Sequence, residues 1–290
     1  MRKNRSHNRK SRTLRALLLL TLLCGGALAD SNLRLVSTEY TLSFPALPPG
    51  FDGLRIVQLS DLHGAVFGKN NRRLIGAVRS ARPDLIALTG DLTERYSDLH
   101  QVDLLLAELV KTAPVYYVSG NHEWQSKTLT PLRELFARRG VVYLRNEAVT
   151  LVRNGDSIVL AGVEDPNGWA DQPKPDQVAA ALPAGSFRVL LGHRNYWAEE
   201  YPALPVDLIL CGHAHGGVIR LPGVGGLLDH HGGLLPRYEA GVYACGRWRM
   251  VVSRGLGNTG GLLRLFNNPE IVTIVLRRAE AGRRGEGEAE

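Results

Sequence analysis

Cysteine is scarce in this sequence: only three occur among 290 residues, too few for a disulfide framework. Cys24 lies in an N-terminal apolar run, which leaves Cys211 and Cys245 for the rest of the chain. One bridge between them is permitted if the protein is exported, but two buried thiols are the simpler expectation. The fold must therefore depend on a hydrophobic core, and a chain with 44% hydrophobic residues can build one.

An excess of positive charge is missing from the body of the protein, although the formal net charge is +7. Seven of the 35 Lys and Arg residues lie in the opening stretch MRKNRSHNRKSRTLR, which contains no acid. The remaining 28 basic residues equal the 28 Asp and Glu residues in number. No basic stripe with interleaved aromatic residues is found, so a nucleic-acid surface is not indicated.

The chain also lacks the continuous run of about 20 apolar residues that a membrane-spanning helix prefers. Its basic opening leads into ALLLLTLLCGGALAD, a shorter apolar run with the small-x-small ending Ala27-Leu28-Ala29. This order is typical of a secretory signal. We interpret residues 1–29 as a signal peptide cleaved after Ala29 or as an uncleaved signal anchor. The rest of the protein is then expected outside the cytoplasm, and at the membrane if the segment is retained.

Short apolar runs alternate with amphipathic stretches from Leu54 onward, which indicates an α/β fold. Strands are expected over 54–60, 84–90, 115–120, 187–192 and 206–212. Helices are expected over 69–81, 97–111 and 128–140, and near 176–182.

Hairpin signals appear in the middle of the chain and near its end. Asn154-Gly155 predicts a tight turn between two strands, and late strands are expected within 241–257 and 270–278. These signals favour two sheets packed together with helices outside, in one domain over 30–278. The charged tail, 279–290, is predicted to be disordered.

Polar residues follow five of the predicted strands at the point where each strand ends. The five segments are Ser60-Asp61-Leu62-His63, Gly90-Asp91, Gly120-Asn121-His122-Glu123, Gly192-His193 and Gly212-His213-Ala214-His215. Such strand ends gather at one edge of an α/β sheet, where ligands bind. A single His-x-His pair decides little, but five of the nine histidines lie in these segments. The joint pattern predicts a metal site.

The residue types indicate which metals would bind. Mixed nitrogen and oxygen ligands suit Mn, Fe, Zn or Co better than Ca or Mg.

The series D-x-H, GD, GNH, GH and GH-x-H resembles the signature of the calcineurin-like metallophosphoesterases, over 54 to about 276. The stretches DGLRIVQLSDLH, GHAHGGVIRLP, SRGLGNTGG and NNPEI are similar to those of its exported or membrane-associated bacterial phosphodiesterases. That branch includes enzymes acting on lipid-linked diphosphates. The resemblance implies a metallophosphoesterase-type β-sandwich of two mixed sheets flanked by helices.

The resemblance also implies a role for each matching residue. The first of two divalent ions would be held by Asp61, His63 and His215. The second would be held by Asn121, His193 and His213, and Asp91 would bridge both ions. Two such ions about 3.5–4 Å apart can clamp the attacking and leaving oxygens of a phosphoryl transfer. A water shared by two cations is acidic enough to be hydroxide near neutral pH, so no Ser or Cys nucleophile would be required. The catalytic residue His122 would not bind metal, but would sit over the scissile phosphate and stabilise or protonate the leaving group.

Several neighbouring residues keep two interpretations. Glu123 could orient a ligand histidine or be a solvated carboxylate. His230-His231 is read as a surface or substrate-loop pair more than as metal ligands. Arg194 stands where relatives often have Asn, and it could line the substrate cleft, as could Trp197 unless it belongs to the core.

The expected function is hydrolysis of an envelope or lipid-linked phosphoester, most simply a phosphodiester. A phosphomonoesterase or phosphoprotein phosphatase of the same fold is an alternative. A catalytically inactive scaffold is another, but such a protein would be expected to have lost ligand residues, and none is missing. A metallo-β-lactamase fold would need Asp-His closely after His-x-His, where this chain has Gly-Gly.

Overall fold

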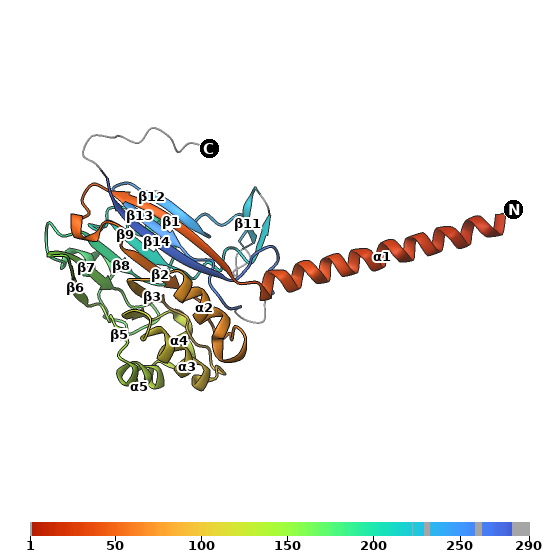
Figure 1. Cartoon of the computed structure of the whole chain (residues 1–290). Coiled ribbons are helices and arrows are strands. Elements are labelled where there is room, and N and C mark those ends of the chain that lie inside the picture. The colour runs from red at the N-terminus through yellow and green to blue at the C-terminus, as the bar shows by residue number, and fades with distance from the viewer. Residues whose placement is uncertain (1, 222, 229–232, 259–262, 280–290) are drawn as a thin grey trace.

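The computed structural model describes residues 2–221, 223–228, 233–258 and 263–279, without the side chains of 2–13 and of residue 16. His230-His231 and all but the first residue of the predicted charged tail lie outside these ranges. Within them, two six-stranded sheets pack together and helices lie outside (Figure 1). The predicted fold, one domain built on two mixed sheets, is confirmed.

The first sheet is mixed, with a parallel block that carries three of the site loops. Its order is β1 (Val36–Phe44), β14 (Glu270–Arg278), β2 (Arg55–Leu59), β3 (Leu85–Thr89), β4 (Val115–Val118) and β5 (Val142–Tyr143). Strands β2 to β5 run parallel, and β14 is antiparallel to β2.

The second sheet carries the other two site loops. Its order is β12 (Gly241–Cys245), β13 (Trp248–Val252), β9 (Leu208–Cys211), β8 (Arg188–Leu191), β7 (Asp156–Gly162) and β6 (Ala148–Arg153). Strands β7, β8, β9 and β13 are parallel. A separate small hairpin pairs β10 (Ile219–Leu221) with β11 (Gly225–Leu228).

Three apolar layers hold the sheets and helices together. One lies between the two sheets. A second lies under α2 (Arg72–Ser80), α3 (Leu99–Leu109) and α5 (Leu129–Arg139). The third lies under α6 (Pro175–Ala180) and α7 (Trp197–Glu200). Each large side chain buried in these layers contributes about 1.5–3 kcal/mol to stability.

The predicted elements are largely confirmed, although one helix begins late and several observed elements were not predicted, among them α4 (Asn121–Ser126), which carries Asn121 and His122. The helix predicted over 69–81 begins only at Arg72, because Asn70 and Asn71 have left-handed backbones with φ of 52° and 59°. Strand β1 was not predicted; it pairs in parallel with β14 over nine residues. The predicted turn is present, since Asn154 and Gly155 both have positive φ.

No disulfide forms among the described cysteines. Cys211 is a buried free thiol, as expected, whereas Cys245 is free but only partly buried.

The N-terminal helix α1 (Arg2–Leu33) extends away from the body of the protein (Figure 1). Most of its described side chains are exposed, including Leu17 at 56% and Leu22 at 64%. No helix within the described residues is both long enough and apolar enough to cross a membrane. The interpretation of residues 1–29 as a signal peptide or anchor stays a prediction.

Candidate metal centre

The five predicted site loops meet at the carboxyl ends of β2, β3, β4, β8 and β9. Backbone hydrogen bonds join loops that are far apart in the sequence. The amide of Asp61 donates to Gly90 O at 3.0 Å, and the amide of Gly212 donates to His193 O at 3.0 Å. The structure thus brings all seven predicted ligand residues and His122 to one place.

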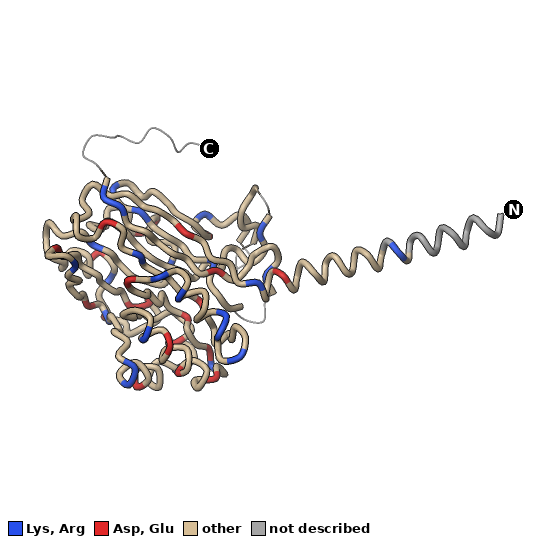
Figure 2. The backbone as a smooth tube through the Cα atoms, in the orientation of Figure 1, with Lys and Arg blue, Asp and Glu red and all other residues tan. Residues whose placement is uncertain are grey.

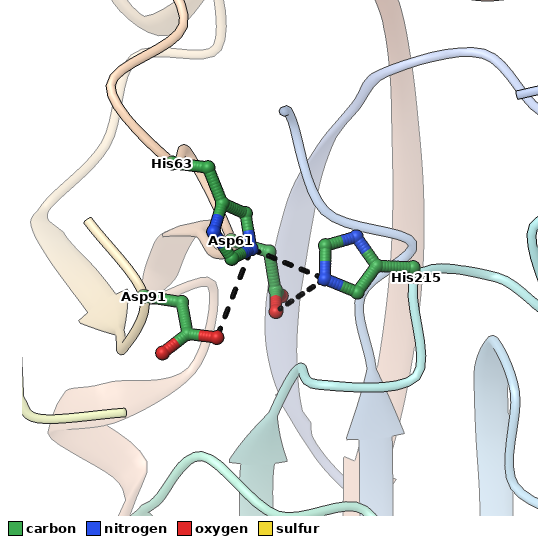
Figure 3. Close-up of side chains that lie close together, drawn as sticks. All are labelled: Asp61, His63, Asp91 and His215. Atoms are coloured by element: carbon green, nitrogen blue, oxygen red, sulfur yellow. Dashed lines mark hydrogen bonds and ion pairs between the residues drawn. The ribbon is translucent and has the colours of Figure 1, made fainter. Parts of the chain in front are cut away.

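Four of these residues form one buried cluster, shown in Figure 3. The Nε2 atoms of His63 and His215 lie 3.1 Å apart. His215 Nε2 is 3.5 Å from Asp61 Oδ1, and His63 Nε2 is 3.7 Å from Asp91 Oδ2. These four side chains therefore point at a common position between them.

A second cluster shares the same aspartate. His193 Nε2 lies 3.2 Å from Asp91 Oδ2 and 3.2 Å from His213 Nδ1. Asp91 Oδ2 is thus close to histidines of both clusters, and a single carboxylate joins them.

The donor atoms fit metal ions. Two imidazole nitrogens about 3 Å apart match ligands of one ion, given metal–nitrogen distances of about 2.0–2.1 Å. Asn121 Oδ1 is buried and has no hydrogen-bond partner among the described residues. A buried amide oxygen without a partner is costly, and a metal ion would satisfy it.

The backbone of the site is strained at the ligand positions themselves. Positive φ angles are found at Asp61 (51°), His63 (49°), Asp91 (51°), His213 (69°) and His215 (50°). Such conformations of residues other than glycine cost about 1–3 kcal/mol each and cluster at functional sites. The surrounding packing has to hold them in place.

Most glycines that precede the ligand residues are not needed for a sharp backbone turn. Only Gly90 has positive φ, at 86°. A Cβ atom at Gly120 would collide with Asp91, and one at Gly192 with the ring of Trp197. The other glycines therefore provide room for close packing, and the ligand residues make the turns.

The buried carboxylates of the site stabilise positive charge close to them. Burial would raise the pKa of Asp91, but the neighbouring His193 and His63 hold it below its usual range. In turn, although burial opposes it, Asp91 raises the pKa of His193 to about 10. Protonated imidazoles thus supply charge that divalent ions would supply when bound.

Each half of the centre has further contacts to its histidines. Glu94 Oε1 lies 2.8 Å from His63 Nδ1, and Arg264 Nη2 lies 3.3 Å from His215 Nδ1. These two residues were not predicted. Glu94 follows Asp91 by three residues, but the sequence pattern contained no signal for Arg264.

The second half is contacted in a parallel way. The Thr89 carbonyl oxygen lies 2.9 Å from His193 Nδ1. Arg194 Nη1 lies 2.9 Å from His213 Nε2, and its guanidinium donates to both carboxylate oxygens of Asp165 at 2.6 and 3.0 Å. Asp165 also follows a strand end, so the rule that found the other loops could have found it.

Glu123 fits neither sequence interpretation. It is fully buried and accepts hydrogen bonds from the backbone amides of Asp91, Thr93 and Gly120, at 2.8–3.0 Å. It therefore holds the two loops together instead of orienting a histidine or facing solvent. Burial, with the nearby Asp91, raises the pKa of Glu123 to about 7.

His122 differs from the ligand residues in its exposure. Its side chain is 25% exposed, whereas that of His63 is 1% exposed. Its Nε2 atom lies 4.0 Å from Asp91 Oδ2, and its Nδ1 atom lies 3.6 Å from Glu94 Oε1. His122 thus borders the metal cluster on a side that solvent reaches.

The structure also shows the positions of Trp197 and Arg194. Trp197 is 1% exposed and belongs to the core, so the alternative that it lines a cleft is wrong. Arg194 lies beside His213 at the candidate metal centre, and its place in the substrate cleft stays a prediction.

Comparison with known proteins identifies the family. A family model described as calcineurin-like phosphoesterase matches residues 54–217, more than half of the chain. The chain belongs to this family. It is 31% identical to the uncharacterized metallophosphoesterase YkuE of Bacillus subtilis over 247 residues, which cover 83% of this chain and 85% of YkuE. It is 32% identical to phosphodiesterase YaeI of Escherichia coli over 233 residues, which cover 77% of this chain and 82% of YaeI.

A third similar protein is an uncharacterized metallophosphoesterase of Aquifex aeolicus, 28% identical over 82% of this chain and 90% of that protein. The resemblance to the calcineurin-like metallophosphoesterases is thereby confirmed, and the chain is a hydrolase that acts on phosphoric ester bonds.

Proposed function

We propose that this chain is a two-metal phosphodiesterase that acts on a lipid-linked or other envelope phosphoester outside the cytoplasm. The observation that carries the two-metal part is the position of Asp91, whose Oδ2 atom is 3.7 Å from His63 Nε2 and 3.2 Å from His193 Nε2. One carboxylate placed between two histidine clusters suits a bridging ligand.

The ligands divide into two sets around this bridge. Asp61, His63 and His215 would hold one ion together with Asp91. His193 and His213 would hold the other ion, together with Asp91 and the unpartnered amide oxygen of Asn121. This donor set suits Mn, Fe, Zn or Co. When bound, two such ions supply Lewis-acid polarisation of the phosphoryl oxygens and an acidified water as the nucleophile.

The remaining chemistry falls to His122. Its ring is partly exposed beside the shared aspartate, where the leaving oxygen of a substrate could be reached. A protonated imidazole there would stabilise or protonate that oxygen, an effect of typically 10²–10⁴-fold. Burial lowers the pKa of His122, and the nearby Asp91 and Glu94 carboxylates oppose that shift. Glu94, 3.6 Å from His122 Nδ1, would keep the ring oriented.

Preference for a diester is supported by the similarity to a protein named a phosphodiesterase. The lipid or envelope substrate is supported by the basic and apolar N-terminal segment, which favours a place at the membrane.

The test is a substrate screen with the purified full chain, loaded with Mn. The substrates are bis-p-nitrophenyl phosphate, p-nitrophenyl phosphate and lipid-linked diphosphates. Diester hydrolysis that exceeds monoester hydrolysis, and that chelation abolishes, is expected. A folded, Mn-loaded protein that prefers the monoester would overturn the phosphodiesterase assignment, and one that hydrolyses none of these substrates would overturn the enzyme function.

A further inference from the structure

Exposed apolar side chains gather where α1 leaves the body. Six of those exposed on the body lie in three short segments: Leu221 (38%), Val224 (61%), Leu234 (74%), Leu235 (62%), Leu263 (55%) and Phe266 (51%). Together with Leu33, at the end of α1 and 64% exposed, we name these residues the α1-exit surface. Isolated exposed apolar residues are ordinary, but a group of this kind marks an interaction site.

Hydrogen bonds join the three segments to one another and to α1. The amide of Leu235 donates to Leu227 O at 3.0 Å, and the amide of Arg220 donates to Leu265 O at 3.0 Å. The amide of Phe266 donates to Ser31 Oγ at 2.7 Å. The hairpin of β10 and β11 lies beside the root of α1 in Figure 1. The α1-exit surface is therefore one connected region and not a set of separate loops.

The helix that leaves this region is itself apolar and uncovered. Residues 16–29 contain no charged residue, and Figure 2 shows that stretch without one. The preceding 15 residues carry seven Lys and Arg and no acid. Exposed leucines next to a basic segment are the combination that binds an anionic lipid surface.

The same region adjoins the metal centre. His215 is followed directly by the chain that enters β10, and the side chain of Asn267 donates to His215 O at 2.6 Å. The α1-exit surface therefore lies one segment away from a predicted metal ligand. A molecule held at that surface would have its polar end near the site.

We propose that the α1-exit surface rests on a lipid bilayer, so that a phosphoester anchored in that bilayer reaches the metal centre from the membrane side. The second half of this statement rests on the proposed function, but the first half does not. The basic opening of the chain argues for lipid as the occupant, because a second copy of this chain would bring the same positive charge.

The first experiment reports the environment of single positions in the full chain. In a Cys24→Ser, Cys245→Ser background, a polarity-sensitive fluorophore is attached to Leu234→Cys, or to Val152→Cys as a control. Both positions are 74% exposed, but Val152 lies on β6 at the far edge of the second sheet. Vesicles of phosphatidylcholine and phosphatidylglycerol should blue-shift the label at 234 and leave the label at 152 unchanged.

Each other outcome counts against the proposal. Vesicle binding without a shift at 234 would place all contact in α1. Equal shifts at both positions would indicate unspecific adsorption. A shift at 234 that needs no vesicles and grows with protein concentration would show that a second copy covers the surface.

The second experiment separates membrane contact from catalysis. Leu234→Glu with Leu235→Glu should weaken vesicle partitioning about tenfold or more, since two leucines lose their burial in lipid. Val152→Glu is the matched control. Hydrolysis of soluble bis-p-nitrophenyl phosphate should be unchanged in both variants, and hydrolysis of a vesicle-borne lipid diphosphate should fall only in the first.

Unchanged partitioning of a folded double variant, checked by its thermal unfolding, would overturn the membrane surface. If the unaltered chain hydrolyses no phosphoester while the double variant partitions weakly, the proposed function fails and the membrane surface stands. The two proposals can therefore fail independently.

Discussion

The candidate metal centre has two halves, one cluster of ligand residues for each proposed ion, and the two halves are similar in arrangement but held in place differently. Each half contains two histidines, and each histidine has one ring nitrogen that points away from the ligand cluster. In one histidine of each half that nitrogen lies beside an oxygen atom, and in the other histidine it lies beside an arginine. The oxygens belong to Glu94 in the first half and to the Thr89 backbone in the second. The arginines are Arg264 and Arg194.

The arginines show where the halves differ. Arg264 is 2% exposed and donates to backbone carbonyls, including Gly257 O at 2.6 Å and Arg254 O at 2.8 Å. Arg194 has a 12% exposed side chain and is held by the carboxylate of Asp165. A positive charge beside an imidazole favours the neutral form, which is the form that binds metal. The arginine of the first half is therefore held in position by backbone carbonyls, whereas the arginine of the second half is held by an ion pair with another side chain.

Backbone strain also differs between the two halves. All three residues particular to the first half, Asp61, His63 and His215, have positive φ, whereas only His213 does so in the second half. A site built into strained backbone is preorganised and loses little freedom on binding. We therefore expect the first half to bind its ion more tightly and the second half to lose its ion first.

The largest effect should come from the residue that the halves share. Asp91→Asn should cost activity on the order of 10³-fold or more, because it weakens the hold on both ions. His63→Ala and His193→Ala each affect one half and should cost less. Turnover and metal content of the three variants test this, and equal losses in all three would argue against a bridge.

His122 is assigned to neither half of the centre, and a variant at this position tests whether it binds metal. His122→Ala should keep both metals and lose about 10²–10⁴-fold on an alkyl phosphodiester. The loss on a nitrophenyl ester should be distinctly smaller, since that leaving group barely needs a proton. Loss of a metal would show that His122 is a ligand, and equal losses on both substrates would make it a phosphate-binding residue.

Variants of the two arginines test whether the two halves are held in place differently. Arg264→Met should destabilise the fold by about 3 kcal/mol, because buried carbonyls lose their donors. Arg194→Gln should also destabilise the fold, because the buried carboxylate of Asp165 loses its charged partner, and it should weaken binding of the second ion by about tenfold. Thermal unfolding and metal titration of both variants measure this, and an Arg194→Gln variant that binds its second ion as tightly as the unaltered chain would contradict the difference between the halves.

The pH dependence of metal binding tests the protonation of His193 in the metal-free protein. Because Asp91 raises the pKa of His193 to about 10, this imidazole is protonated in the metal-free protein below that pH. Metal must displace the proton, so affinity should rise with pH by up to about tenfold per unit until the pKa is reached. Calorimetry in buffers of different ionisation enthalpy would detect the released proton. Affinity independent of pH between 6 and 9, roughly, would contradict it.

The difference between the halves also explains what the sequence could predict. The ligand loops follow strand ends, and this local rule places Asp61, Asp91 and His193 without any knowledge of distant contacts. Arg264 could not be found in this way, because its contact with His215 spans 49 residues and no motif surrounds it. Strand β1 was missed for a similar reason, since its partner β14 lies more than 230 residues away.

The role of Glu123 was misjudged for a different reason. A carboxylate next to a site histidine is normally expected to face that histidine or solvent. Here the loops after β3 and β4 leave three amides without strand partners, and Glu123 satisfies all three. Such a role depends on how two loops approach each other, which neither loop encodes alone.

Metal stoichiometry of the full chain tests whether Asp91 joins two metal-binding clusters in one centre. The protein is loaded with Mn, freed of excess ions and analysed for metal, next to Asp91→Asn as the control. We expect close to two ions per unaltered chain, with the ion held by His193 and His213 lost first under mild chelation. We also expect a clear loss of both ions from Asp91→Asn. A well-folded chain that holds one ion or none, or an Asp91→Asn variant that keeps two, would contradict it.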